Sequence, residues 1–78
     1  MKRASLQLKD EKIIKQVVAK LKALRHEHNA SQEDVYNDTN IHIGRIEQGK
    51  LNISISTLAA LCRYFGISLS DFFAGFDL

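Results

Sequence analysis

The spacing of apolar residues constrains this chain most strongly, because it follows the period of an α-helix in successive segments. The longest such segment spans residues 13–24, where Ile, Val and Leu recur every three or four positions. Proline is absent, glycine occurs only four times, and no alternating Val, Ile and Thr run indicates a strand. We therefore predict an all-α fold, a compact bundle of five helices joined by short turns.

The predicted helix boundaries follow from capping residues. The first helix ends at His28 and Asn29, because asparagine tolerates the left-handed conformation of a C-cap. Ser31 opens a second helix that runs only to about Asn37 or Asp38. The third helix covers roughly residues 41–48 and stops at Gly49. The remaining predicted boundary residues are Ser54 or Ser56 and Gly66 for the fourth helix, and Ser68 for a short fifth helix.

The length of 78 residues predicts a single domain over 1–78, with residues 1–10 as a candidate flexible N-terminal arm. A lone cysteine, Cys62, excludes an internal disulfide and suits a reducing compartment. No apolar run approaches the roughly 18 residues of a membrane span, and no signal peptide follows the basic N-terminus. We expect a cytoplasmic protein.

Enzymatic and cofactor chemistry finds little support in the sequence. Residues 44–50 match most of a phosphate-binding loop, but Leu51 occupies the position that needs Ser or Thr. His26 and His28 point about 200° apart on a helix, so they do not share a metal ion. We expect no catalytic residues, no metal, no cofactor and no small-molecule ligand.

Positive charge is concentrated in the first third of the chain. Residues 1–28 hold eight Lys or Arg against three Asp or Glu, although the whole chain carries a net charge of only +2. This segment either contacts a polyanion or is the solvated face of an amphipathic helix, and composition favours the solvated face.

The second and third helices are short and joined by a turn of about three residues, which is typical of a helix-turn-helix. His42, Arg45 and Gln48 lie three residues apart and are expected to face outward together, with Thr39 and Asn40 at the start of the third helix. Arginine suits bidentate contact with guanine, and Asn or Gln suits adenine. From this pattern alone, DNA recognition and a solvated helix face are equally supported.

Four motifs in sequence order resemble a known family. They are residues 31–35 (SQEDV), 43–50 (IGRIEQGK), 52–58 (NISISTL) and 66–73 (GISLSDFF). Together they resemble the lambda-repressor-like helix-turn-helix proteins, of the phage repressor, Cro and XRE type, over residues 13–74. The resemblance implies a lambda-repressor-like bundle that binds double-stranded DNA. The loop at residues 52–55 also looks like that of restriction–modification controller proteins.

The resemblance also implies roles for individual residues. Gln32 would bind a phosphate, and Lys50 and Asn52 would contact the DNA backbone. Gly44 stands where a phosphate-binding serine is usual. Arg25 and Glu47 would form a structural ion pair that ties the first helix to the end of the third. The expected DNA-binding residues are Gln32, Thr39, Asn40, His42, Gly44, Arg45, Gln48, Lys50 and Asn52.

The chain departs from the family pattern in its helix-turn-helix unit. The segment from Gln32 to Glu47 is three residues shorter than usual. Either the first turn of the recognition helix is missing, or the second helix is truncated and Thr39 caps a recognition helix of normal length. Tyr36 replaces a small alanine, so helix packing there must differ. Three acidic residues would repel phosphate unless they point away, namely Glu33, Asp34 and Asp38.

Four apolar side chains crowd the last seven residues, namely Phe72, Phe73, Phe76 and Leu78. One or two of them can cap the core, but a chain this small is not expected to bury all four, so we predict an exposed apolar patch there. A two-fold dimer through this segment would bury the patch and place two recognition helices about 34 Å apart.

The sequence therefore predicts a DNA-binding transcriptional regulator. It would act as a homodimer on a palindromic or pseudo-palindromic operator, with the third helix in the major groove. A controller protein, a phage repressor and the antitoxin of a toxin pair remain open as particular roles. The alternative outside this class is a protein–protein adaptor of the same fold, with a toxin or the transcription machinery as partner.

Overall fold

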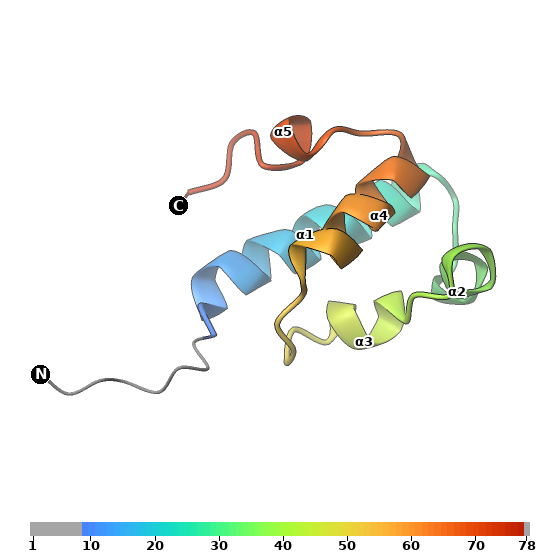
Figure 1. Ribbon diagram of the computed structural model, residues 1–78, viewed down its shortest axis with the longest axis horizontal. Helices are drawn as coiled ribbons and strands as arrows, with labels where there is room; N and C mark the ends of the chain where they lie inside the picture. The colour runs from blue at the N-terminus through green and yellow to red at the C-terminus, as the bar shows by residue number, and fades with distance from the viewer. Residues whose placement is uncertain (1–8, 78) are drawn as a thin grey trace, which may run out of the picture.

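The computed structural model describes residues 9–77, which form five helices and contain no strand. Figure 1 shows the two longest helices crossing the centre of the molecule, α2 and α3 together beyond one side of them, and α5 on the opposite side. The helices are α1 (Glu11–Glu27), α2 (Gln32–Thr39), α3 (Ile43–Glu47), α4 (Ile55–Phe65) and α5 (Leu69–Phe72). The predicted all-α fold is confirmed. Residues 1–8 of the predicted arm and Leu78 lie outside the described residues.

Helix α1 has the C-terminal end and the apolar face that its sequence predicts, and Asp10 caps its start. The Asp10 side chain accepts hydrogen bonds from the backbone N–H groups of Lys12 and Ile13, which satisfies donors that the first turn leaves unpaired. After the helix ends, Asn29 takes the left-handed conformation, with φ of 53°. The buried residues of α1 are Ile14, Val17, Leu21 and Leu24.

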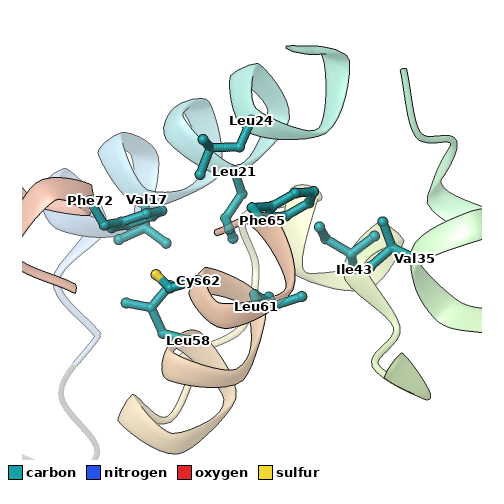
Figure 2. Packing of buried hydrophobic residues seen from close by; sticks show 10 residues of the cluster. All are labelled: Val17, Leu21, Leu24, Val35, Ile43, Leu58, Leu61, Cys62, Phe65 and Phe72. Carbon is teal, nitrogen blue, oxygen red and sulfur yellow. The ribbon is translucent and has the colours of Figure 1, made fainter. Parts of the chain in front are cut away.

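The hydrophobic core lies between α1 and α4 and extends to the helix-turn-helix (Figure 2). Val35 of α2 and Ile43 of α3 have no exposed surface, so both short helices are anchored to this core. Cys62 is 2% exposed and packs as a small core residue, as expected, and burial raises the pKa of its thiol.

Phe72 is one of the aromatic residues that cap the core, so the prediction that it belongs to the dimer interface is wrong. Its side chain is completely buried, because the short α5 directs the ring into the core cluster alongside Val17 (Figure 2). Phe73 and Phe76 are half-buried and contact Phe72 and each other, with ring centroids 4.9–5.7 Å apart. The backbone of Asp77 exchanges two hydrogen bonds with the Gln16 side chain, which fastens this segment to α1.

The turn between α2 and α3 differs from the predicted boundaries. Helix α2 continues to Thr39, and α3 begins only at Ile43. Thr39 does not cap α3, because its hydroxyl donates to the Val35 carbonyl at 2.7 Å and accepts from the Ile41 N–H. Asn40 ends α2 in the left-handed conformation, with φ of 65°. Of the two interpretations of the shortened segment, the structure has the one in which α3 is short and lacks its first turn.

Helices α4 and α5 begin at the serines that the sequence indicates. Ser54, rather than Ser56, caps α4, because its hydroxyl accepts a hydrogen bond from the Thr57 N–H. Ser68 caps α5, because its hydroxyl accepts a hydrogen bond from the Asp71 N–H. Gly66 ends α4 with φ of 73°, a conformation that side chains disfavour. Within residues 9–77, no helix combines the length and the apolar character that crossing a membrane requires.

Candidate nucleic-acid interface

The outer face of α3 is polar and its inner face is apolar. Arg45 and Gln48 are exposed, as is His42, the residue that precedes the helix. On the opposite face, Ile43 is buried and Ile46 is half-buried against the core. The predicted orientation of α3 is therefore confirmed, and it leaves one arginine and one amide exposed side by side.

A hollow of about 390 Å³ separates the outer face of α3 from α2. Tyr36, on the α2 side of this hollow, stacks on His42 with ring centroids 4.3 Å apart and planes 24° apart. The sequence indicated a packing change at Tyr36 but not this contact. Both aromatic residues therefore form part of the wall of this hollow.

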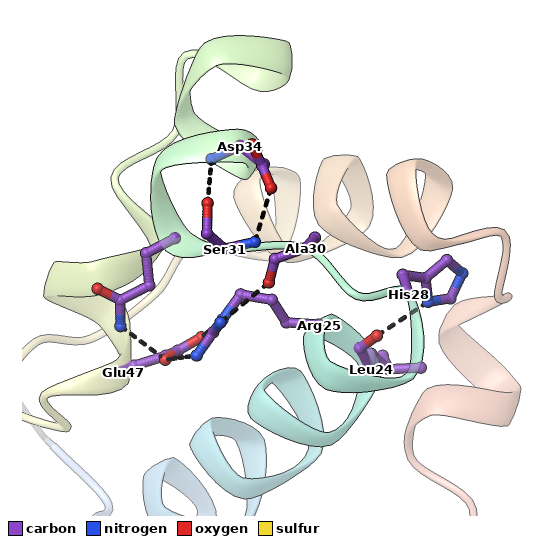
Figure 3. Close-up of polar contacts among 8 residues, drawn as sticks. Leu24, Arg25, His28, Ala30, Ser31, Asp34 and Glu47 are labelled. Carbon is purple, nitrogen blue, oxygen red and sulfur yellow. Dashed lines mark hydrogen bonds and ion pairs between the residues drawn. The ribbon is translucent and has the colours of Figure 1, made fainter.

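Helix α3 is fixed to α1 by the predicted pair Arg25 and Glu47. The Arg25 guanidinium donates to both Glu47 carboxylate oxygens, at 2.8 and 3.0 Å, and to the Ala30 carbonyl at 3.0 Å (Figure 3). Their side chains are 12% and 2% exposed. This bidentate, nearly dry geometry holds the end of α3 against the last turn of α1.

The surroundings of Glu47 keep it ionised. Burial by itself raises the pKa of its carboxyl, but the hydrogen bonds from Arg25 and Gln32 and the charges of Arg25 and Lys22 lower it more. The pKa of Glu47 therefore lies below its ordinary value. The Glu47 hydrogen bond also raises the pKa of Arg25 against the effect of burial. At neutral pH both partners are charged and hydrogen-bonded.

Gln32, the residue expected to bind phosphate, points toward α3. Its amide nitrogen donates to the Glu47 carboxylate at 2.9 Å, so one of its two amide hydrogens is used inside the protein. Gly44 makes room for this arrangement, because a Cβ atom there would lie 2.9 Å from the Gln32 amide oxygen. The absence of the usual serine at position 44 and the orientation of Gln32 are therefore linked.

Two of the three acidic residues on α2 are engaged away from the outer face of α3. Asp34 completes the capping box by accepting from the Ser31 N–H while its own N–H donates to the Ser31 hydroxyl (Figure 3). These hydrogen bonds lower the pKa of Asp34. Asp38 accepts a 2.6 Å hydrogen bond from the Tyr64 hydroxyl of α4. Of the three, Glu33 alone lines the hollow between α2 and α3.

The remaining predicted contact residues fall into two groups. A second hollow, of about 210 Å³, brings Asn52 together with His42 and Arg45, and Lys50 is exposed in the loop beside it. Thr39 and Asn40 line neither hollow. Thr39 is half-buried with its hydroxyl bonded in the turn, whereas Asn40 is exposed.

Sequence comparison matches residues 20–74 to the Cro/C1-type HTH DNA-binding domain. The match covers more than half of the chain and includes α2, the turn and α3. The chain therefore belongs to this family of DNA-binding helix-turn-helix proteins, which are associated with transcription regulation. Comparison with curated proteins found no match, and comparison with solved structures found none either.

Proposed function

We propose that this protein is a sequence-specific regulator of transcription whose α3 enters the major groove of its operator. The observation that carries the proposal is the outward face of α3, where Arg45 and Gln48 are exposed on a helix fixed from behind by Glu47. A rigid backbone presenting an arginine and an amide is what direct readout of base edges requires. Family membership supplies the DNA-binding class.

Within this proposal, base readout rests on fewer residues than in a helix of normal length. Helix α3 has only five residues, so Arg45 lies at its centre and Gln48 directly follows its end. The stacked Tyr36 and His42 are positioned to contact a base edge or a thymine methyl group beside them. We no longer propose Thr39 as a DNA contact, because its hydroxyl is hydrogen-bonded within the turn.

Backbone contacts are assigned to the residues that flank α3. Gln32 retains one amide hydrogen for a phosphate, and Lys50 and Asn52 follow α3 on the exposed loop. Asn40 is exposed at the turn and completes this group. Such contacts position the duplex without reading its sequence, and they make affinity depend on salt.

The proposal is tested by fluorescence anisotropy with the DNA upstream of the protein's own gene and with a scrambled duplex. We expect a marked preference for the upstream sequence. Arg45→Ala should weaken specific binding by about 1–3 kcal/mol and relax the requirement at one base pair. Arg63→Ala is the matched control, because Arg63 is exposed on α4 and lines neither hollow. Weak binding to both duplexes, unchanged by Arg45→Ala, would contradict the proposal.

The proposed regulator acts as a homodimer through Phe73 and Phe76. Both rings are half-buried on the C-terminal segment, so each keeps an apolar edge available to a second copy. Sedimentation should give a dimer for the full chain and a monomer for Phe76→Ala. Arg63→Ala is the control, since Arg63 is exposed on α4 and the substitution keeps both rings and the Gln16–Asp77 hydrogen bonds. A dimer of unchanged strength in Phe76→Ala would place the interface elsewhere.

A protein-partner role, as an adaptor or antitoxin, has one observation in its favour. Leu51 and Ile55, beside the start of α4, are 49% and 67% exposed, which is high for large apolar side chains. In that role, Ile55→Ser would abolish capture of the protein partner and leave DNA affinity intact, because Ile55 lines none of the hollows around α3. The same variant should leave a regulator that contacts only DNA unaffected.

A further inference from the structure

A further hollow connects the long helix α1 with the end of the helix-turn-helix. It has a volume of about 700 Å³ and lies between the exposed side of α1 and the end of α3. Val18 and Ala19 supply its apolar lining, and Gln48 and Gly49 close it on the α3 side. Its most abundant side chains are lysines, namely Lys9, Lys12, Lys15 and Lys22. We call this hollow the α1 lysine groove.

The α1 lysine groove carries an excess of positive charge. Two glutamates also line it, Glu11 and Glu47. Glu47 is neutralised from within by Arg25. Lys12 pairs with Asp77 at 3.1 Å, but both side chains are more than 60% exposed, and pairs this exposed are weak. The groove therefore offers several solvated ammonium groups to an anionic ligand.

The groove is continuous with the proposed DNA-reading surface. Gln48 lines both the α1 lysine groove and the hollow between α2 and α3. A duplex held against Arg45 and Gln48 would therefore bring a sugar–phosphate strand to the mouth of the groove. From Lys12 to Lys22 the helix rises about 15 Å, the axial length of about four phosphates on one strand.

We propose that the α1 lysine groove binds the phosphodiester backbone of the same DNA duplex that α3 reads. This inference rests on the proposed function and adds a second row of phosphate contacts that the helix-turn-helix does not provide. The basic first third of the chain is then a DNA contact and not only a solvated helix face. The bound ligand is the phosphate backbone, so the groove adds affinity without adding sequence preference.

The test is the salt dependence of DNA affinity in Lys15→Gln/Lys22→Gln. The logarithm of the DNA association constant falls as the logarithm of the salt concentration rises. Loss of two phosphate contacts should make this fall less steep, reducing the magnitude of the slope by about 2. The preference for specific over scrambled DNA should stay unchanged. The matched control is Lys20→Gln/Arg63→Gln, which removes the same charge from residues that do not line the groove. Lys15→Arg/Lys22→Arg should restore the parent slope, since charge is retained.

The outcomes separate this inference from the proposed function. Equal slopes for the groove variant and its control, with specific binding retained and sensitive to Arg45→Ala, would overturn the groove alone. No specific binding by the parent chain would overturn both. Thermal unfolding of each variant checks the fold, and we expect only a small change, because Lys15 and Lys22 are exposed and Lys22 is the weakest of the groups that lower the pKa of Glu47.

Discussion

Helices α3 and α4 follow one another in the chain but are held in place by different means. Helix α4 has eleven residues and is closed at both ends by its own neighbours, Ser54 and Gly66. Helix α3 has five residues, and His42 at its start makes no side-chain capping bond. Instead α3 is held by the burial of Ile43 and by the ion pair of Glu47 with Arg25, 22 residues away.

This difference shows where the proposed DNA-reading surface gets its rigidity. Isolated helices shorter than about 12 residues are marginal in water, so a five-residue helix depends on tertiary contacts. The exposed face of α3 is therefore only as well ordered as the contacts behind it. Helix α4, by contrast, gains part of its stability from local capping.

Among the substitutions that test how α3 and α4 are held, we expect the largest effect from Arg25→Ala. It leaves the Glu47 carboxylate buried with only the Gln32 hydrogen bond, so we expect a loss of about 3 kcal/mol of unfolding free energy. Urea denaturation followed by circular dichroism measures the loss. Arg45→Ala, on the exposed face of the same helix, should change stability by less than about 0.5 kcal/mol. Equal losses in both variants would mean that the pair does not hold α3.

Acid should weaken α3 through the same pair. Because the folded pKa of Glu47 is lowered, its contribution is fully present above the ordinary carboxyl pKa of about 4.3 and is lost as pH falls through the folded value. Stability of the parent chain should therefore fall more steeply in acid than that of Glu47→Gln. The difference between the two curves is the measurement, since the lowered pKa of Asp34 contributes to both. Parallel curves would contradict the assignment to Glu47.

On the α4 side, loss of a cap should have a smaller and local effect. Ser54→Ala removes the acceptor for the Thr57 N–H and should cost about 1 kcal/mol. Amide hydrogen exchange should increase in the first turn of α4 and not in α3. Ser56→Ala is the control, because Ser56 is exposed and does not cap the helix. Faster exchange throughout α3 would show that the two helices are not held independently.

The smallest expected effect is at Gly44. In Gly44→Ala the new methyl group displaces the Gln32 amide from Glu47, while alanine favours the helix by about 1 kcal/mol over glycine. We expect these effects to offset each other in the parent chain. In a Gln32→Ala background the conflict is absent, so the same substitution should stabilise by about 1 kcal/mol. Equal changes in both backgrounds would show that the two side chains are not coupled.

Most of the fold was predictable because its signals are local. The apolar period of α1, the serine caps of α2, α4 and α5, and the left-handed residues Asn29 and Gly66 each act within a few residues of where they stand. The pair Arg25 and Glu47 was predictable only through resemblance to a family, since nothing in its own sequence neighbourhood indicates it.

The sequence by itself determined the helical class, the helix order and the outward face of α3, because periodicity and capping are properties of neighbouring residues. Tertiary structure decided between the two interpretations of the shortened helix-turn-helix, and it placed Phe72 in the core and Gln32 against Glu47. It also joined the lysines of α1 to the end of α3 in one groove. These features depend on residues far apart in the chain, whose relative positions are fixed only when the core packs.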